Sequence, residues 1–214
     1  MSDRRLPIFF LIDTSGSMKG EPIESVNIGL RALVSALRQN PYALETVYLS
    51  ITTFNIQVEE ILPLTAVETV IVPEVTCPAS GATMLGAALS FVVQKAQREV
   101  RRSSADAKGD WRPLLFVLTD GKPSDSLAYS EAAQLVRAFG FGSIVACAAG
   151  PKADANVLKA FTDQVVSLDT MDAHSFANFF QWVSTAVTAG SSSVGATNTG
   201  GALPPPPPEV HFVI

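Results

Sequence analysis

The chain has 214 residues, of which 47% are hydrophobic and only 16% are charged. This length and composition predict one domain with a sizeable core, followed by a tail. The formal net charge is −5 and no Lys/Arg-rich run occurs, which argues against nucleic acid as a partner. No segment approaches the roughly 20 apolar residues that a membrane-spanning helix needs, so we expect no membrane span.

The cysteines and the first apolar run bear on the cellular compartment. Cys77 and Cys147 are the two cysteines, and they show no disulfide framework, which favours a reducing compartment. The apolar run at 7–12 follows a basic start, as in a signal peptide, but it is shorter than the apolar core of such a peptide. We therefore interpret the run as a first buried strand and expect a cytoplasmic protein.

Strand and helix patterns alternate along the chain. Continuous apolar or β-branched runs predict strands at 7–12, 46–54, 114–119, 143–149 and 165–168, with an antiparallel edge strand at 58–62. Apolar residues at helical spacing predict helices at 22–38, 85–100, 126–139, 154–161 and from 172 onward. This alternation predicts an α/β fold with a three-layer, Rossmann-like, doubly wound and mainly parallel sheet that has one antiparallel edge strand.

Two kinds of segment fall outside this alternation. Residues 63–82 are irregular and contain prolines, and loops of this length are often functional. The domain is predicted to span 1–189, followed by a flexible Gly/Ser/Pro-rich linker at 190–208 that ends in a proline run. The apolar, β-prone segment at 209–214 is predicted to dock on a sheet edge of this domain or of a partner, with a disordered end as the alternative.

The turn after the first predicted strand combines one carboxylate with two hydroxyls. Asp13, Ser15 and Ser17 stand at alternate positions, with a glycine between the two serines. Three small oxygen donors at this spacing can converge on one hard cation. Asp120 also follows a strongly apolar strand. Ligands of parallel sheets bind beyond the carboxyl ends of the strands, so we expect Asp13 and Asp120 to meet if their strands are neighbours.

Three separated pieces of sequence match one known pattern. They are the Asp-x-Ser-x-Ser turn at 13–17, Thr83 after a glycine, and Thr119-Asp120-Gly121. Over about residues 6–189 the sequence resembles the von Willebrand factor A (VWA) domain family with its metal-ion-dependent adhesion site. The resemblance implies that one divalent metal ion is held by five residues, Asp13, Ser15, Ser17, Thr83 and Asp120.

The chemistry of these five side chains agrees with that implication. All five donors are hard oxygens, which select Mg²⁺, with Mn²⁺ or Ca²⁺ as alternatives, over zinc. Only two of the donors are carboxylates, so a doubly charged ion keeps its affinity for a further anion, such as an Asp or Glu of a partner protein. The prediction is metal-dependent docking to a protein, with no catalytic residues.

Several nearby residues have simpler interpretations. Asp125 can orient a water of the site, but capping of the third predicted helix is the preferred interpretation. Lys19 and Lys122 can attract an acidic ligand or can simply be solvated. His174 and His211 are far apart in sequence and lack a zinc-binding spacing.

An enzyme is the first alternative. Ser17, Asp120 and His174 occur in the chain order of an α/β-hydrolase triad. The glycine expected two residues before the nucleophile is missing, however, and His174 is predicted to lie in the first turn of a helix. A VWA subunit of a chelatase or ATPase assembly is the second alternative.

Two segments point to one branch of the family. Residues 4–30 and 114–125 are most similar to the bacterial tellurium-resistance (TerY-type) branch of VWA proteins. That resemblance implies an intracellular adaptor or scaffold of the tellurite or general stress response, with protein kinase or phosphatase partners. No tellurium chemistry follows from the predicted metal site.

Overall fold

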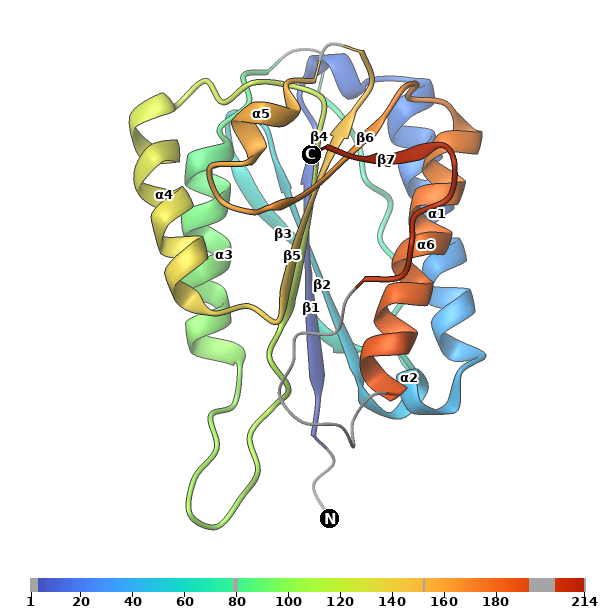
Figure 1. Cartoon of the computed structure of the whole chain (residues 1–214), viewed down its shortest axis with the longest axis vertical. Helices are drawn as coiled ribbons and strands as arrows, with labels where there is room; N and C mark the ends of the chain where they lie inside the picture. Colours follow the sequence, from blue (N-terminus) through green and yellow to red (C-terminus); the bar gives the residue numbers. More distant parts are fainter. Residues whose placement is uncertain (1–3, 79–80, 152, 193–202, 214) are drawn as a thin grey trace.

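Strands and helices alternate through the described chain, which comprises residues 4–78, 81–151, 153–192 and 203–213 of the computed structural model (Figure 1). The strands are β1 (Leu6–Asp13), β2 (Val47–Phe54), β3 (Val58–Ala66), β4 (Leu114–Thr119), β5 (Ser143–Ala149), β6 (Gln164–Leu168) and β7 (Val210–Phe212). The helices are α1 (Glu21–Arg38), α2 (Pro41–Thr46), α3 (Leu85–Glu99), α4 (Ser126–Phe139), α5 (Ala155–Leu158) and α6 (Ala173–Ser192), with a short 3-10 turn at Gly16–Met18.

One seven-stranded sheet has the order β3-β2-β1-β4-β5-β6-β7. The five inner strands β2, β1, β4, β5 and β6 are parallel to one another. The edge strands β3 and β7 pair antiparallel with β2 and β6. The predicted doubly wound, mainly parallel fold is therefore confirmed, and β7 adds a second antiparallel edge strand that the prediction lacked. The strand order reverses between β1 and β4, which are neighbours at the centre of the sheet.

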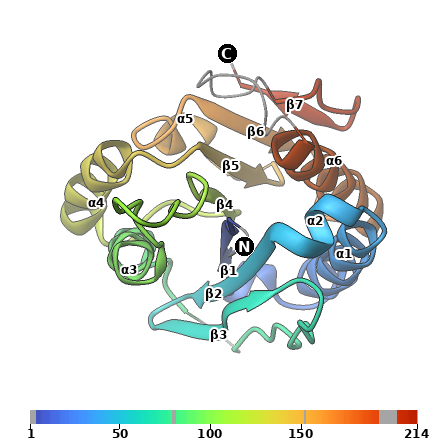
Figure 2. The same ribbon diagram turned by 90° about the horizontal axis from the view of Figure 1, so that it is seen from below.

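Helices cover both faces of the sheet. Helices α1 and α6 lie on one side, and α3 and α4 lie on the other (Figures 1 and 2). All of β1 is buried, as expected for a parallel strand that is covered on both faces. Phe10 packs in the core cluster of α1 and α6, whereas its neighbour Leu11 packs in the cluster of α3 and α4. No helix in the described part of the chain is both long enough and apolar enough to cross a bilayer.

Several element ends shift by a few residues, α5 for example covering only Ala155–Leu158 of the predicted 154–161, and two larger differences have local reasons. Strand β3 continues to Ala66, past the predicted start of a loop at 63. The pairing of β2 with β3 shifts register near Pro63, and an edge strand with such an irregularity tolerates proline. Asn40 does not only end α1: its side chain accepts a hydrogen bond of 3.0 Å from the backbone of Ala43 and starts the extra helix α2.

The tail also differs from the prediction. Helix α6 extends to Ser192, so residues 190–192 are helical and the predicted flexible linker does not begin at 190. Residues 193–202 of that predicted linker lie outside the described residues. Strand β7 pairs with β6 of the same chain, so the terminal segment docks on this domain's own sheet edge and is not a disordered end.

Helix α3 meets α4 at a glycine. A β-carbon added at Gly86 would lie 2.3 Å from the backbone nitrogen of Tyr129, closer than real contacts allow. We expect Gly86→Ala to lower the free energy of unfolding by about 1–3 kcal/mol, because backbone atoms of α4 must move. The exposed neighbour Ala87 provides the control, and Ala87→Ser should change the free energy of unfolding by less than about 0.5 kcal/mol. Urea unfolding measures both effects, and equal unfolding midpoints for Gly86→Ala and the wild-type chain would contradict the close contact.

Candidate metal centre

Asp13 is the last residue of β1 and is fully buried. The chain turns directly after it, and the backbone N–H of Ser15 donates a hydrogen bond of 2.8 Å to Asp13 Oδ1. The hydroxyl oxygens of Ser15 and Ser17 lie 3.3 Å apart. The turn therefore brings together its three predicted donors, one carboxylate and two hydroxyls.

The end of β4 lies beside this turn. The parallel pairing of Ile12 with Leu118 places Thr119 next to Asp13. The Thr119 hydroxyl donates a hydrogen bond of 2.6 Å to Asp13 Oδ2 and accepts one of 3.2 Å from the backbone of Gly121. The sequence analysis gave Thr119 no role of its own. Its place opposite Asp13, at the end of the neighbouring strand, is the signal that could have identified it.

Asp120 carries the clearest sign of a missing ligand. The residue is only 5% exposed, and its Oδ1 has no hydrogen-bond partner among the described residues. Burial raises the pKa of Asp13, hydrogen bonds from Thr119 and Ser15 lower it, and the charge of Asp120 raises it further. Two buried carboxylates without a cation are unfavourable. The pair therefore fits a divalent metal ion.

Thr83 joins the site from the loop before α3. Its backbone N–H donates to the Ser124 hydroxyl (3.2 Å), and its carbonyl accepts from the Ser124 N–H (2.8 Å). A β-carbon added at Gly121 would lie 3.1 Å from Thr83 Oγ1. The Thr83 hydroxyl is thus held against the backbone that directly follows Asp120. The structure brings the five predicted residues to one edge of the sheet, and their role as metal ligands stays a prediction.

Asp125 caps a different helix from the one predicted. Its carboxylate accepts hydrogen bonds from the backbone of Gly86 (3.1 Å) and Ala87 (2.9 Å), in the first turn of α3. It makes no side-chain cap for its own helix, α4. The reason is spatial, because the first turns of α3 and α4 are in contact where Gly86 meets Tyr129. Asp125 thereby anchors the helix that follows Thr83.

Asn55, directly after β2, connects two loops of the site. Its side-chain amide donates a hydrogen bond of 2.9 Å to the hydroxyl of Thr14, inside the aspartate-serine turn. The backbone carbonyl of Asn55 accepts a hydrogen bond of 2.9 Å from the backbone N–H of Met84, next to Thr83. The sequence analysis did not include Asn55 in the predicted site. A polar residue at the carboxyl end of a central strand was the available signal.

Residues 8–181 match the profile of the von Willebrand factor type A domain. The chain belongs to the VWA domain family. A comparison with curated proteins found no match. VWA domains bind a divalent metal at the metal-ion-dependent adhesion site, and the buried, unpartnered oxygen of Asp120 fits such a site here.

Solved structures share the fold at low sequence identity. One is proximal thread matrix protein 1 from the mussel byssus with a zinc-occupied metal site (TM-score 0.63, 17% identity, 86% of this chain and 48% of that chain). Another is the ArnB paralog VWA2 from Sulfolobus acidocaldarius (TM-score 0.61, 16% identity, covering 87% of this chain and 46% of that chain). A third is the pilus adhesin SpaC from Lactobacillus rhamnosus GG (TM-score 0.70, 11% identity, covering 89% of this chain and 31% of that chain). This VWA domain thus spans less than half the length of these proteins.

Ser17 and His174, two members of the hydrolase alternative, have other contacts in this VWA domain. Ser17 contacts Ser15, whereas the His174 ring on α6 lies 3.1 Å from Asn178 and 3.6 Å from Glu209. Within the described residues no hydrogen bond links His174 to Ser17 or Asp120. No three His, Cys, Asp or Glu side chains gather into a metal site within those residues either.

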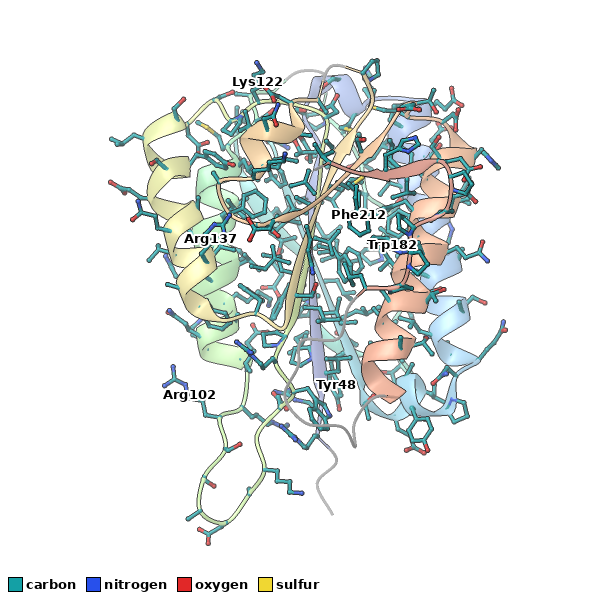
Figure 3. All side chains as sticks on the ribbon, in the orientation of Figure 1. Tyr48, Arg102, Lys122, Arg137, Trp182 and Phe212 are labelled. Atoms are coloured by element: carbon teal, nitrogen blue, oxygen red, sulfur yellow. The ribbon has the colours of Figure 1, made fainter. Side chains whose placement is uncertain are left out.

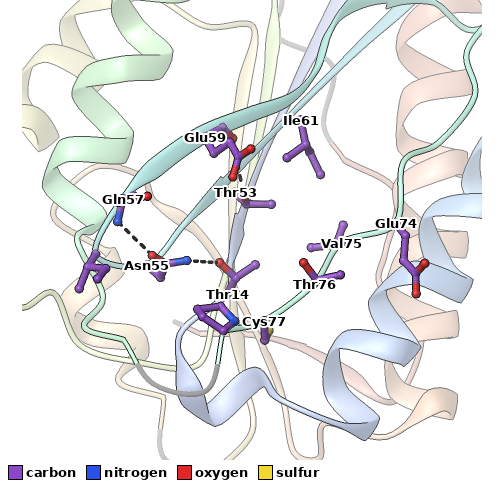
Figure 4. A pocket seen from close by; sticks show the side chains of 12 residues that line it. Thr14, Thr53, Asn55, Gln57, Glu59, Ile61, Glu74, Val75, Thr76 and Cys77 are labelled. Atoms are coloured by element: carbon purple, nitrogen blue, oxygen red, sulfur yellow. Dashed lines mark hydrogen bonds between the residues drawn. The ribbon is translucent and has the colours of Figure 1, made fainter.

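A recess of about 550 Å³ adjoins the aspartate-serine turn (Figure 4). Thr14 of the turn, the β2–β3 hairpin and residues 74–78 line it, and the described lining residues include the carboxylates of Glu59 and Glu74 but no cationic side chain. The half-buried Cys77 also lines it, and burial, followed by the charges of the site aspartates, raises the pKa of this thiol to about 11. Lys122, two residues after Asp120, forms an exposed ion pair of 3.1 Å with Asp154.

We expect Mg²⁺ to raise the Tm of the wild-type chain, because an ion at 100 times its Kd stabilises the folded state by about 2.7 kcal/mol. Asp120→Asn should remove most of this rise. Without metal, the same variant should be at least as stable as the wild type, because a buried charge beside Asp13 is gone. Thermal melts with Mg²⁺ and with EDTA test both statements, and equal metal-induced rises in the two proteins would contradict them.

The Thr119 hydroxyl gives a second test that leaves all five donors in place. Thr119→Val keeps the shape of the side chain but removes the hydrogen bond to Asp13, so the metal Kd should rise about 10–100-fold. Thr119→Ser retains the hydroxyl and should bind nearly as well as the wild type. Isothermal titration with Mn²⁺ measures the affinities. An unchanged Kd for the valine variant would show that Thr119 does not orient the carboxylate.

Proposed function

We propose that this VWA domain docks a partner protein through a divalent ion. The residues proposed to hold the ion are Asp13, Ser15, Ser17, Thr83 and Asp120. The observation that carries the proposal is the buried Oδ1 of Asp120, which lacks any partner among the described residues. Buried carboxylate oxygens rarely stay unpaired, and a metal ion is the partner that this set of neighbouring oxygens fits best.

The donor set supports docking to an acidic group. Three of the five donors are neutral hydroxyls, and only Asp13 and Asp120 carry charge. A divalent ion bound there supplies a positive charge that an Asp or Glu of the partner can reach. We propose Mg²⁺ as the ion, with Mn²⁺ or Ca²⁺ as alternatives, because the donors are hard oxygens. Zinc occupies the site of the mussel byssus protein, so its affinity for this site should be compared with that of Mg²⁺.

The surface beside the turn supports a protein as the partner. The recess is bordered by the hairpin between β2 and β3, where Ile56 is 58% exposed. A protein that places a carboxylate at the ion can therefore also place a neighbouring side chain in the recess. The lining carboxylates of Glu59 and Glu74 favour a neutral or basic side chain at that point.

The proposal assigns no catalytic residue and no enzymatic activity. Its finer part rests on the similarity of residues 4–30 and 114–125 to the bacterial tellurium-resistance, TerY-type branch. On that basis we propose a bacterial, cytoplasmic adaptor of the tellurite or general stress response. A protein kinase or phosphatase is the proposed partner. A VWA subunit of a chelatase or ATPase assembly is the alternative, and co-purification of an ATPase would favour it.

We expect partner capture from a lysate to need both the ion and the site. The wild-type chain with Mg²⁺ should retain proteins that it loses with EDTA, because chelation removes the charge that binds their carboxylates. Asp120→Asn should lose the same proteins in the presence of Mg²⁺. Asp163, an exposed carboxylate that pairs with Arg137 outside the site, provides the control, and Asp163→Asn should retain them. The same proteins in all samples, identified by mass spectrometry, would contradict the proposal.

A further inference from the structure

The C-terminal segment, defined as residues 203–213, occupies the free edge of β6. Strand β7 pairs antiparallel with β6 from Val166 opposite Phe212 to Leu168 opposite Val210. One residue further, the backbone N–H of Val213 donates a hydrogen bond of 2.8 Å to the carbonyl of Val165. Figure 2 shows β7 beside β6, at the end of the sheet next to α6. The segment thus binds as an added strand.

Alternate side chains of β7 add specific contacts. Val210 is 1% exposed and belongs to the core cluster that contains α6. Phe212 lies edge-on against Trp182 of α6, with ring centroids 6.0 Å apart (Figure 3). Val213, which points to the other face of the sheet, packs against the cluster of α3 and α4. The edge of β6 therefore favours a Val-x-Phe pattern through the burial of Val210 and the contact of Phe212 with Trp182, as well as through backbone hydrogen bonds.

The proline run is held by the same tryptophan. The indole N–H of Trp182 donates a hydrogen bond of 2.9 Å to the carbonyl of Pro204, and Leu203 packs against the core. An aromatic side chain that donates to the backbone of a proline run is the chemistry by which protein grooves bind proline-rich peptides. We call the edge of β6 from 165 to 168, together with Trp182, the β6-edge site.

The segment is held less firmly than the rest of the sheet. Val210 is its only buried residue, and the other residues from 203 to 213 are half-buried or exposed. Its ion pairs, Glu209 with His174 at 3.6 Å and His211 with Asp169 at 3.4 Å, are largely exposed, and such pairs contribute little. Release of the segment therefore exposes one fully buried side chain, Val210, together with the partial contacts of its neighbours, and leaves the other members of both core clusters in place.

We propose that the β6-edge site is a peptide-binding site, and that the C-terminal segment is its intramolecular ligand. The ligand class is an extended apolar segment with a Val-x-Phe pattern that follows several prolines, supplied by another protein. Only ten residues separate Ser192 at the end of α6 from Leu203. Such a short connection gives a local concentration in the millimolar range, so the chain's own segment excludes a free peptide until it is released. The site does not involve the metal.

A labelled peptide with the sequence of residues 203–214 tests the proposal by fluorescence anisotropy. The full-length wild-type chain should bind it weakly. Full-length Val210→Asp, whose own segment can no longer enter the core, should bind it about tenfold more tightly or better. The peptide that carries the same Val210→Asp change should not bind. EDTA should not alter any of these results.

A substitution of Trp182 tests whether this side chain recognises the prolines of the peptide. Trp182→Phe in the Val210→Asp chain keeps an aromatic ring but removes the N–H, so peptide binding should weaken several-fold. A thermal melt checks that this chain is folded. Equal, weak peptide binding by the wild-type and Val210→Asp chains would overturn the site, and unchanged binding after Trp182→Phe would overturn recognition of the prolines. Self-association of Val210→Asp that the peptide reverses would support the site, and self-association that it does not reverse would overturn it.

Discussion

Two buried carboxylates at the carboxyl ends of the two central strands place the strongest constraint on this structure. Asp13 ends β1 and Asp120 directly follows β4, the neighbouring strand, and both residues are buried, where unpaired negative charge is costly. Asp13 is partly compensated by Thr119 and by the backbone of Ser15, whereas one oxygen of Asp120 has no partner among the described residues. Local stability is therefore given up at the point where a cation can restore it. A fold selected for stability alone would have no reason to keep this pair.

The hydroxyl donors are positioned by polar contacts between loops, not by the apolar core. Asn55 joins the aspartate-serine turn to the loop of Thr83, and Ser124 joins that loop to the end of β4. Asp125 fixes the start of α3 from the neighbouring loop. Most of these contacts use backbone atoms on at least one side, and Asp125 is the one charged group among them. In the proposed function, the two carboxylates supply the charge that attracts the cation, and the cross-links between the loops hold the donors in place.

The elements that could be predicted are those specified by their own sequence. Strand β4 and helix α4 have the predicted bounds because an unbroken apolar run or a regular apolar stripe defines each one. Asp13 and Asp120 could be proposed because they stand at the carboxyl ends of such strands, whereas Thr83 was assigned from the family resemblance. The partner of Asp125, the two links made by Asn55 and the pairing of β7 could not be predicted in the same way. Each depends on which segments meet in space, and a local pattern carries no information about that.

The two proposed recognition surfaces differ in the physical quantity that controls them. The site of Asp13 and Asp120 depends on charge and therefore on the availability of a divalent ion. The β6-edge site depends on backbone hydrogen bonds and apolar contacts, and strand β5 separates it from the central pair of strands. Its ligand is part of the same chain, so it is closed by default and opens only when the C-terminal segment leaves. A chelator should therefore act on one surface and a competing segment on the other, which allows one small domain to respond independently to two conditions.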